Sequence, residues 1–150
     1  MISALSANYN QRRFGDMEGM ETLTQGQGLT LGTWDVRPEE VEAYLAAVGD
    51  LAPLYRQAGA APPLAVVARA FSLLLQRLSL PPGSVHSAQE VESLAPVPVG
   101  SRVTFSLRVA QQSKRAGWQF MTLELAAHDA AGSVLLRGKS TVMSPTGEQA

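Results

Sequence analysis

The sequence predicts a single α+β domain in which an antiparallel sheet wraps around a central apolar helix. The 150 residues suit one domain, and 45% of them are apolar, which is enough for a real core. Residues 64–78 are apolar nearly all the way round, as in a helix at the centre of a fold. Residues 103–143 hold three stretches of alternating apolar and polar residues joined by short turns, the pattern of an antiparallel meander.

Composition excludes several classes of function. A net charge of -1 gives no electrostatic footprint for nucleic acid or for an anionic membrane. The absence of cysteine excludes disulfides, thiolate zinc sites and cysteine nucleophiles, and His86 and His128 alone cannot build a His-rich metal site. No stretch approaches the roughly 18 to 20 apolar residues of a membrane span, and no secretory signal is visible. We therefore expect a soluble, cytoplasmic protein without a cofactor or metal.

The chain is expected to begin with a weakly ordered arm over residues 1–28, with a short helix near residues 16–23. Glycine and polar residues interrupt any periodicity there. We place the folded domain at residues 29–144 and a C-terminal tail at residues 145–150.

The first folded elements are a strand and a helix. Residues 29–36 alternate as a strand does. Pro38 fits the first turn of a helix, which Gly49 ends. One face of this helix is expected to be buried because its apolar residues follow helical spacing: Val41, Tyr44, Leu45 and Val48.

The next elements are a small-residue loop over residues 58–63 and the apolar helix over residues 64–78, which includes Phe71. A Pro-Pro-Gly breaker at residues 81–83 ends the helix. Residues 85–93 are predicted to form a strand, followed by a proline-rich elbow over residues 95–100. Three strands follow, with turns at residues 114–117 and 129–132.

The stretch between the two helices, residues 48–56, is the candidate site. It holds Asp50, the only carboxylate between Glu42 and Glu90, placed between a glycine turn and a proline turn. Two interpretations stay open. Asp50 is either a functional acid beside the apolar helix or a residue that solvates the turn after Gly49.

Several motifs, taken in order, resemble the MaoC-like dehydratases and R-specific enoyl-CoA hydratases, which have a hotdog fold, and in particular their FAS1-like dehydratase branch. The spacing of Tyr44, Gly49, Asp50, Pro53 and Leu54 partly matches the family's Tyr…Gly-Asp-x-Asn-Pro-Leu-His signature. Further matches lie at residues 56, 60–63, 85–90, 98–101, 115–120 and 132–134. The resemblance covers about residues 29–144 and implies a single hotdog domain.

In catalytic members of this family an Asp and a His flank a water molecule in the mouth of an acyl-thioester tunnel. Water adds to C3 of a 2-enoyl thioester, which requires two titratable groups around one water. A backbone N–H at a helix N-terminus polarises the thioester carbonyl, and amides near Leu64 could supply it here. The resemblance implies a catalytic role for Asp50 and makes Pro53, Leu64 and Phe71 the candidate substrate-binding residues.

Two positions depart from the family pattern. Ala52 stands where the family has Asn, and Tyr55 stands where it has the catalytic His. A tyrosine is a poor base at neutral pH, although it can donate a hydrogen bond. His86 is the other candidate for the second catalytic group, but it could equally be a structural histidine in the sheet or in an interface.

Three functions stay open. The first is a hydratase or dehydratase acting on acyl-CoA or acyl-carrier-protein thioesters, with Asp50 aided by Tyr55 or His86. The second is a non-catalytic hotdog subunit that holds the acyl chain beside a catalytic partner. The third is a hotdog thioesterase. For all three we expect a homodimer, or a heterodimer with a second hotdog chain, because one hotdog leaves a sheet edge exposed.

Overall fold

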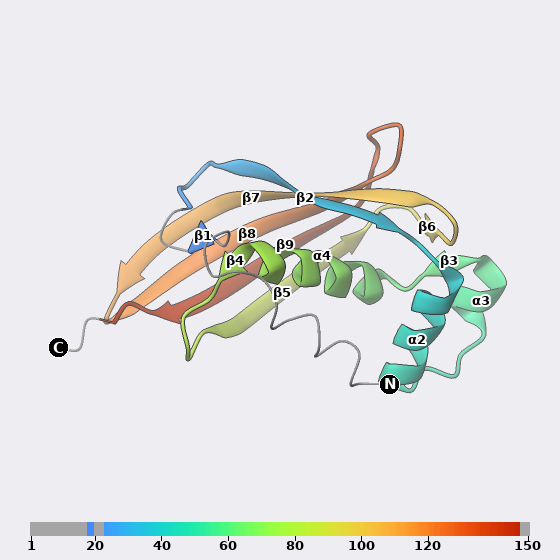
Figure 1. Cartoon of the computed structure of the whole chain (residues 1–150), viewed down its shortest axis with the longest axis horizontal. Helices are drawn as coiled ribbons and strands as arrows, with labels where there is room; N and C mark the ends of the chain where they lie inside the picture. Colours follow the sequence, from blue (N-terminus) through green and yellow to red (C-terminus); the bar gives the residue numbers. More distant parts are fainter. Residues whose placement is uncertain (1–17, 20–22, 148–150) are drawn as a thin grey trace.

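A computed structural model describes residues 18–19 and 23–147 (Figure 1). The elements in chain order are β1 (Glu18–Gly19), β2 (Gly28–Asp35), α2 (Pro38–Val48), α3 (Leu54–Ala58), β3 (Ala60–Ala61), α4 (Pro63–Arg77), β4 (Leu78–Ser79), β5 (Val85–Ser93), β6 (Val97–Pro98), β7 (Arg102–Arg115), β8 (Trp118–His128) and β9 (Val134–Pro145). The predicted strand, helix, helix and strand order is confirmed, with the short α3 as an unpredicted helix between the two expected ones. The bounds of β2, α2, α4 and β5 differ from the predicted ones by one residue at most, whereas β7 continues into the turn expected at residues 114–117.

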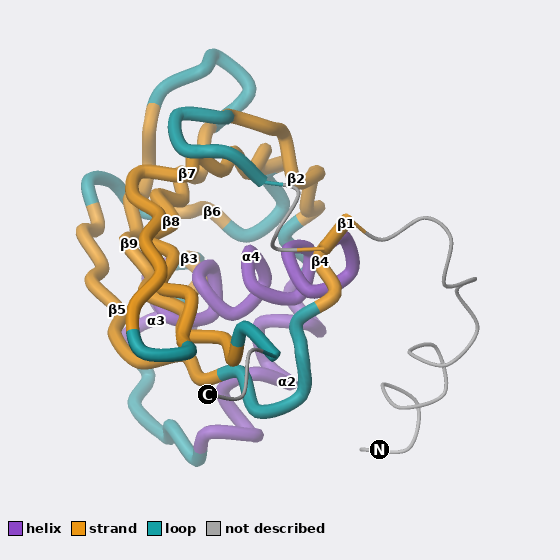
Figure 2. Tube along the Cα trace, turned by 90° about the vertical axis from the view of Figure 1, so that its left-hand side faces the viewer, coloured by secondary structure: helices purple, strands orange, loops and turns teal. Residues whose placement is uncertain are grey.

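The central sheet has five antiparallel strands in the order β2-β7-β8-β9-β5. The predicted meander is its middle, β7-β8-β9. The first turn of the meander places Ala116 at φ 52° and Gly117 at φ 78°, the two left-handed residues of a type I′ hairpin. The sheet curves around α4, which lies along its inner face (Figures 1 and 2). The α+β architecture predicted from the sequence is therefore confirmed.

The core lies between α4 and the inner face of the sheet. Val66, Ala70 and Leu74 of α4 are buried against a sheet face that includes Phe105 and Leu123. The alternation of buried and less buried residues along β7 and β8 is the one that the sequence pattern predicts.

Both helices are less buried than their apolar residues suggest. On α4, Leu64 is 59% exposed and Phe71 is only partly buried. On α2, Val41 and Leu45 are buried as predicted, but Val48 is 57% exposed. The physical reason is that each helix meets the core along one side, so apolar residues on its other side stay exposed.

Part of the expected N-terminal arm belongs to the folded body. Leu23 is buried in the core, and Gly26 and Gln27 exchange backbone hydrogen bonds with Val109. Residues 18–19 form a short parallel pairing with residues 78–79 rather than helix. The remainder of the expected helix lies outside the described residues. No helix in the described part of the chain is long and apolar enough to cross a membrane.

Candidate functional site

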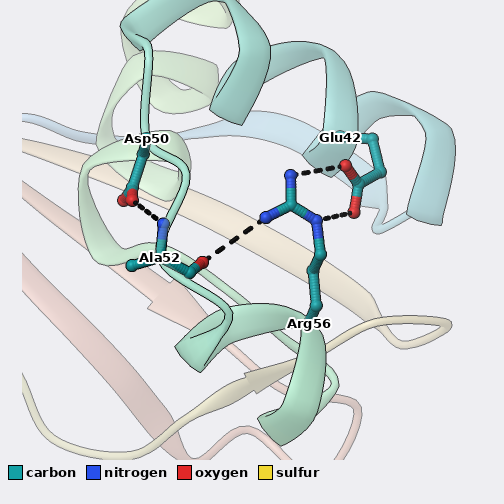
Figure 3. A network of polar contacts seen from close by, with 4 residues as sticks. All are labelled: Glu42, Asp50, Ala52 and Arg56. Atoms are coloured by element: carbon teal, nitrogen blue, oxygen red, sulfur yellow. Dashed lines mark hydrogen bonds and ion pairs between the residues drawn. The ribbon is translucent and has the colours of Figure 1, made fainter.

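The loop between α2 and α3 presents Asp50. Gly49 has φ 70°, and the Asp50 N–H donates to the Leu45 carbonyl at 2.9 Å, so the helix ends in a left-handed cap. The Asp50 side chain is partly buried, and its Oδ1 accepts the Ala52 N–H at 2.9 Å (Figure 3). Asp50 therefore stabilises the turn after Gly49, in agreement with one of its two interpretations. Its second oxygen, Oδ2, has no hydrogen bond to any described residue, which leaves one carboxylate oxygen for other chemistry.

Arg56 of α3 holds the loop from its other side. Its Nε donates to Glu42 Oε1 at 2.7 Å and its Nη2 to Glu42 Oε2 at 2.8 Å, so the pair joins α3 to α2 (Figure 3). Its Nη1 also approaches the Ala52 carbonyl at 3.4 Å. The hydrogen bonds to Glu42 raise the pKa of the Arg56 guanidinium, which keeps it a permanent charge.

Tyr44 joins Asp50 and Tyr55 in one neighbourhood. Partial burial raises the pKa of the Tyr44 phenol, and the nearby Tyr55 and Asp50 raise it further. Tyr44 therefore stays a protonated hydrogen-bond donor at neutral pH. The sequence pattern placed Tyr44 on the buried face of α2. Its position in the same motif as Asp50 was the sequence feature that could have marked Tyr44 as a residue of the site.

An apolar groove of about 350 Å³ lies beside this loop. Leu54 and Tyr55 of α3 form one wall, Pro63 lies at the start of α4, and Ser93 and Leu94 close the far side at the end of β5. The volume is at the small end of the range for ligand pockets. Large apolar side chains remain exposed in the surrounding segments, at Leu51, Leu54, Leu64 and Leu94. Of the six candidate site residues, Tyr55 alone is among those that line the groove.

The start of α4 offers a backbone donor. Pro62 is the N-cap and Pro63 has no N–H, while the N–H groups of Ala65 and Val66 both donate to the Pro62 carbonyl. The N–H of Leu64 has no backbone partner among the described residues. A free N–H at the positive end of a helix can polarise a carbonyl oxygen, as the resemblance implies for this position.

The other candidates lie elsewhere. Pro53 is exposed at the N-cap of α3. Phe71 lies two turns along α4, where its ring stacks on the ring of His86, with centroids 4.5 Å apart. His86 is at the first end of β5, whereas the groove meets the last residue of that strand, Ser93. Seven residues of strand span about 20 Å, so within one chain His86 is far from the groove beside Asp50.

A larger hollow of about 830 Å³ lies on the sheet face away from α4. None of its lining residues belongs to the Asp50 loop, and its walls carry balanced, partly paired charges: Glu90, Glu92, Arg108, Glu124, Arg137 and Lys139. We attribute it to a solvated face of a twisted sheet. In the described part of the chain, no group of three or more His, Asp or Glu side chains could hold a metal ion.

Comparison with known proteins identifies the fold. Neither a protein family model nor a curated protein matches the sequence. A MaoC-like dehydratase from Rhodospirillum rubrum superposes with a TM-score of 0.72 at 19% identity, covering 87% of this chain and 98% of that one. The (R)-hydratase from A. caviae involved in PHA biosynthesis gives 0.69 at 24% identity, covering 83% and 99%. The HadBC (3R-hydroxyacyl-ACP dehydratase) complex from Mycobacterium tuberculosis gives 0.70 at 16% identity, covering 83% and 100%.

These likenesses extend over most of this chain and nearly all of each matched chain. At such identities they show the fold: this chain has the hotdog fold of the MaoC-like dehydratases and (R)-hydratases. The predicted fold class is therefore confirmed.

Proposed function

Starting from this hotdog fold, we propose that the chain is a MaoC-like hydratase or dehydratase acting on 2-enoyl or 3-hydroxyacyl thioesters. One arrangement carries the proposal. The free carboxylate oxygen of Asp50, the Tyr55 groove and the unpaired Leu64 N–H belong to three segments that follow one another in the chain. A water activator, an acyl site and a carbonyl-polarising donor are the parts that hydration of an enoyl thioester requires.

In the proposed reaction Asp50 removes a proton from water through Oδ2. The water oxygen bonds to C3 while the C2–C3 π electrons move toward C2 and the thioester carbonyl. The Leu64 N–H stabilises the negative charge on that carbonyl oxygen. C2 then takes a proton from a second group, for which Tyr55 and His86 are the candidates. Pro53 and Phe71 do not line the groove, so they would contact an acyl chain only where it extends beyond the groove.

The runner-up is a non-catalytic subunit that holds an acyl thioester beside a catalytic partner. Two observations favour it. The position of the family's catalytic His is Tyr55, and one oxygen of Asp50 is already engaged by the Ala52 N–H. It predicts a stable complex with a second hotdog chain that carries both catalytic residues, and no activity for this chain alone.

We further propose that the chain works as a dimer. Strand β5 is one of the two edge strands of the five-stranded sheet in the described residues, and most of its side chains are exposed. Among them Val85 and Val91 are apolar, and Leu94 follows directly. An exposed apolar edge strand is a template for pairing with another chain. Light scattering at micromolar concentration should give the mass of a dimer, and a monomer would contradict this part of the proposal.

Hydration of crotonyl-CoA and of a longer 2-enoyl-CoA tests the function, followed by loss of the conjugated thioester absorbance. Asp50→Asn should lower kcat by about 10²- to 10⁴-fold, the usual contribution of a general base. Asp129→Asn is the matched control, because Asp129 also caps a turn, accepting the Ala131 and Ser133 N–H groups, in a hairpin loop of the meander. Equal activity in the two variants would remove Asp50 from the mechanism.

A further inference from the structure

We propose that the second catalytic group of each site is His86 of the partner subunit. This inference rests on the proposed hydratase function and on the proposed dimer. It makes each site composite: one chain supplies Asp50 and the Tyr55 groove, and the partner's His86 supplies the imidazole that the position of Tyr55 lacks.

The hydrogen bonds of His86 prepare it for such a role. The Gln89 side-chain N–H donates to the Glu90 carbonyl at 2.8 Å, so the orientation of the Gln89 amide is fixed. Gln89 Oε1 accepts from the hydroxyl of Ser140, which is fully buried, and lies 3.1 Å from His86 Nε2. Because an amide oxygen only accepts, Nε2 carries the proton. The other nitrogen, Nδ1, has no hydrogen bond to any described residue and is left to exchange protons.

The ring of His86 is also held in place, although the residue is exposed in the single chain. It stacks on Phe71 of α4 with 25° between the ring planes. Its cross-strand neighbour Val142 is buried on the inner face of the sheet, so His86 lies on the side of the sheet that faces α4. An exposed imidazole with a fixed tautomer and a stacked ring is preorganised. The groove of its own chain lies about 20 Å away along β5.

If a twofold axis pairs β5 of one subunit with β5 of the other, His86 of one subunit comes close to the groove of its partner. In an antiparallel pair the first residues of one strand lie opposite the last residues of the other. β5 carries a bulge between His86 and Ala88, so Ser87 is the extra residue. If Glu90 pairs with Glu90 of the second copy, Gln89 lies opposite Val91, and His86 lies opposite Ser93.

This register keeps the faces of the sheet consistent. Ser93 pairs with Leu136, which is buried on the inner face and lines the groove, and His86 pairs with the buried Val142. The partner's His86 would therefore sit about 5 Å from Ser93 between Cβ atoms, on the wall of the groove that contains Tyr55. The pairing also covers Val91, which is 37% exposed in the single chain.

The chemistry then balances within one composite site. Asp50 takes a proton from water as the water oxygen bonds to C3. The π electrons move to C2 and the thioester carbonyl. The proton taken by Asp50 passes through water to Nδ1 of the partner's His86, and from there to C2. The product is the 3-hydroxyacyl thioester, and the reverse sequence is dehydration.

Heterodimers purified by two different affinity tags test this assignment. Asp50→Asn and His86→Ala homodimers should each lose about 10²- to 10⁴-fold of the hydratase activity. A heterodimer with one Asp50→Asn chain and one His86→Ala chain contains one intact composite site, so it should recover about half of the wild-type activity. A heterodimer of the wild-type chain with a chain carrying both substitutions has a lesion in each site, and it should stay as inactive as the single variants.

The opposite result overturns the inference. If both residues act within one chain, the first heterodimer is inactive and the second has half of the wild-type activity. If His86→Ala homodimers are fully active, His86 is not a catalytic residue. These failures differ from failure of the proposed function itself, which would leave the wild-type dimer inactive on every 2-enoyl thioester tested. His86 is exposed, so loss of folding is not expected in its variant, and retention of the dimer by light scattering checks this.

Discussion

Truncation of Leu74 to Ala tests whether α4 packs into the sheet as described. Leu74 is 2% exposed, so the truncation removes buried methyl groups and leaves a cavity that the surrounding core fills only in part. Buried Leu→Ala changes cost about 3 to 5 kcal/mol of unfolding free energy. In a chain of this size each kcal/mol lowers Tm by about 2 to 4 °C, so a fall of roughly 6 to 20 °C is expected.

The same substitution at Leu64 is the matched control. Leu64 lies on the same helix but is 59% exposed, so Leu64→Ala should change the unfolding free energy by less than about 0.5 kcal/mol. Urea unfolding followed by circular dichroism, at several protein concentrations, measures both. The loss of unfolding free energy in Leu74→Ala should not depend on protein concentration. A loss in Leu64→Ala that becomes smaller on dilution would instead show that Leu64 lies in a subunit contact. A cost below about 1 kcal/mol at Leu74 would refute the packing of α4.

Three further predictions follow from local geometry. The raised pKa of Tyr44 favours its protonated form in the folded chain, so its contribution to stability is full below the unfolded pKa of about 10 and is lost as pH rises through the folded pKa. In urea melts between pH 9 and 11, Tyr44→Phe should flatten the alkaline decline in unfolding free energy, and an unchanged decline would contradict this. Ala116 is strained at φ 52° in the hairpin, so Ala116→Asn should raise the unfolding free energy by roughly 0.5 to 1 kcal/mol, whereas a lower Tm would argue against this turn geometry. The exposed Arg56–Glu42 pair should show a coupling below about 1 kcal/mol in a double-mutant cycle, weakening with salt, and a larger, salt-independent coupling would mean that the pair is buried in the assembly.

Most of the fold could be predicted because its boundaries are marked by residues with strong local preferences. Pro38 and Gly49 bracket α2, and proline also starts α4, so both helices begin and end close to where the sequence indicates. The period of two in β7 and β8 gave the buried face, since each buried residue is two positions from the next. Proline, glycine and the alternation of apolar residues act locally, so the structure that they favour is also found in the folded chain.

The depth of burial and the arrangement of the site are not local. Helical spacing assigned Val48 and Phe71 to buried faces, but spacing cannot tell how much of each face the rest of the chain covers. Leu23 is a single leucine in a glycine-rich stretch, so no sequence pattern predicts its burial. The separation of His86 from Asp50 depends on which end of β5 meets the groove, and that is a property of the sheet order.

We propose above that this chain hydrates 2-enoyl thioesters with Asp50. The first measurement is the absorbance of crotonyl-CoA and a longer 2-enoyl-CoA mixed with the purified wild-type protein alone. We expect the conjugated thioester absorbance to fall with the wild-type protein and to stay almost unchanged with Asp50→Asn. A folded, dimeric wild-type protein that leaves both substrates unchanged would contradict the proposal and would favour the acyl-holding subunit.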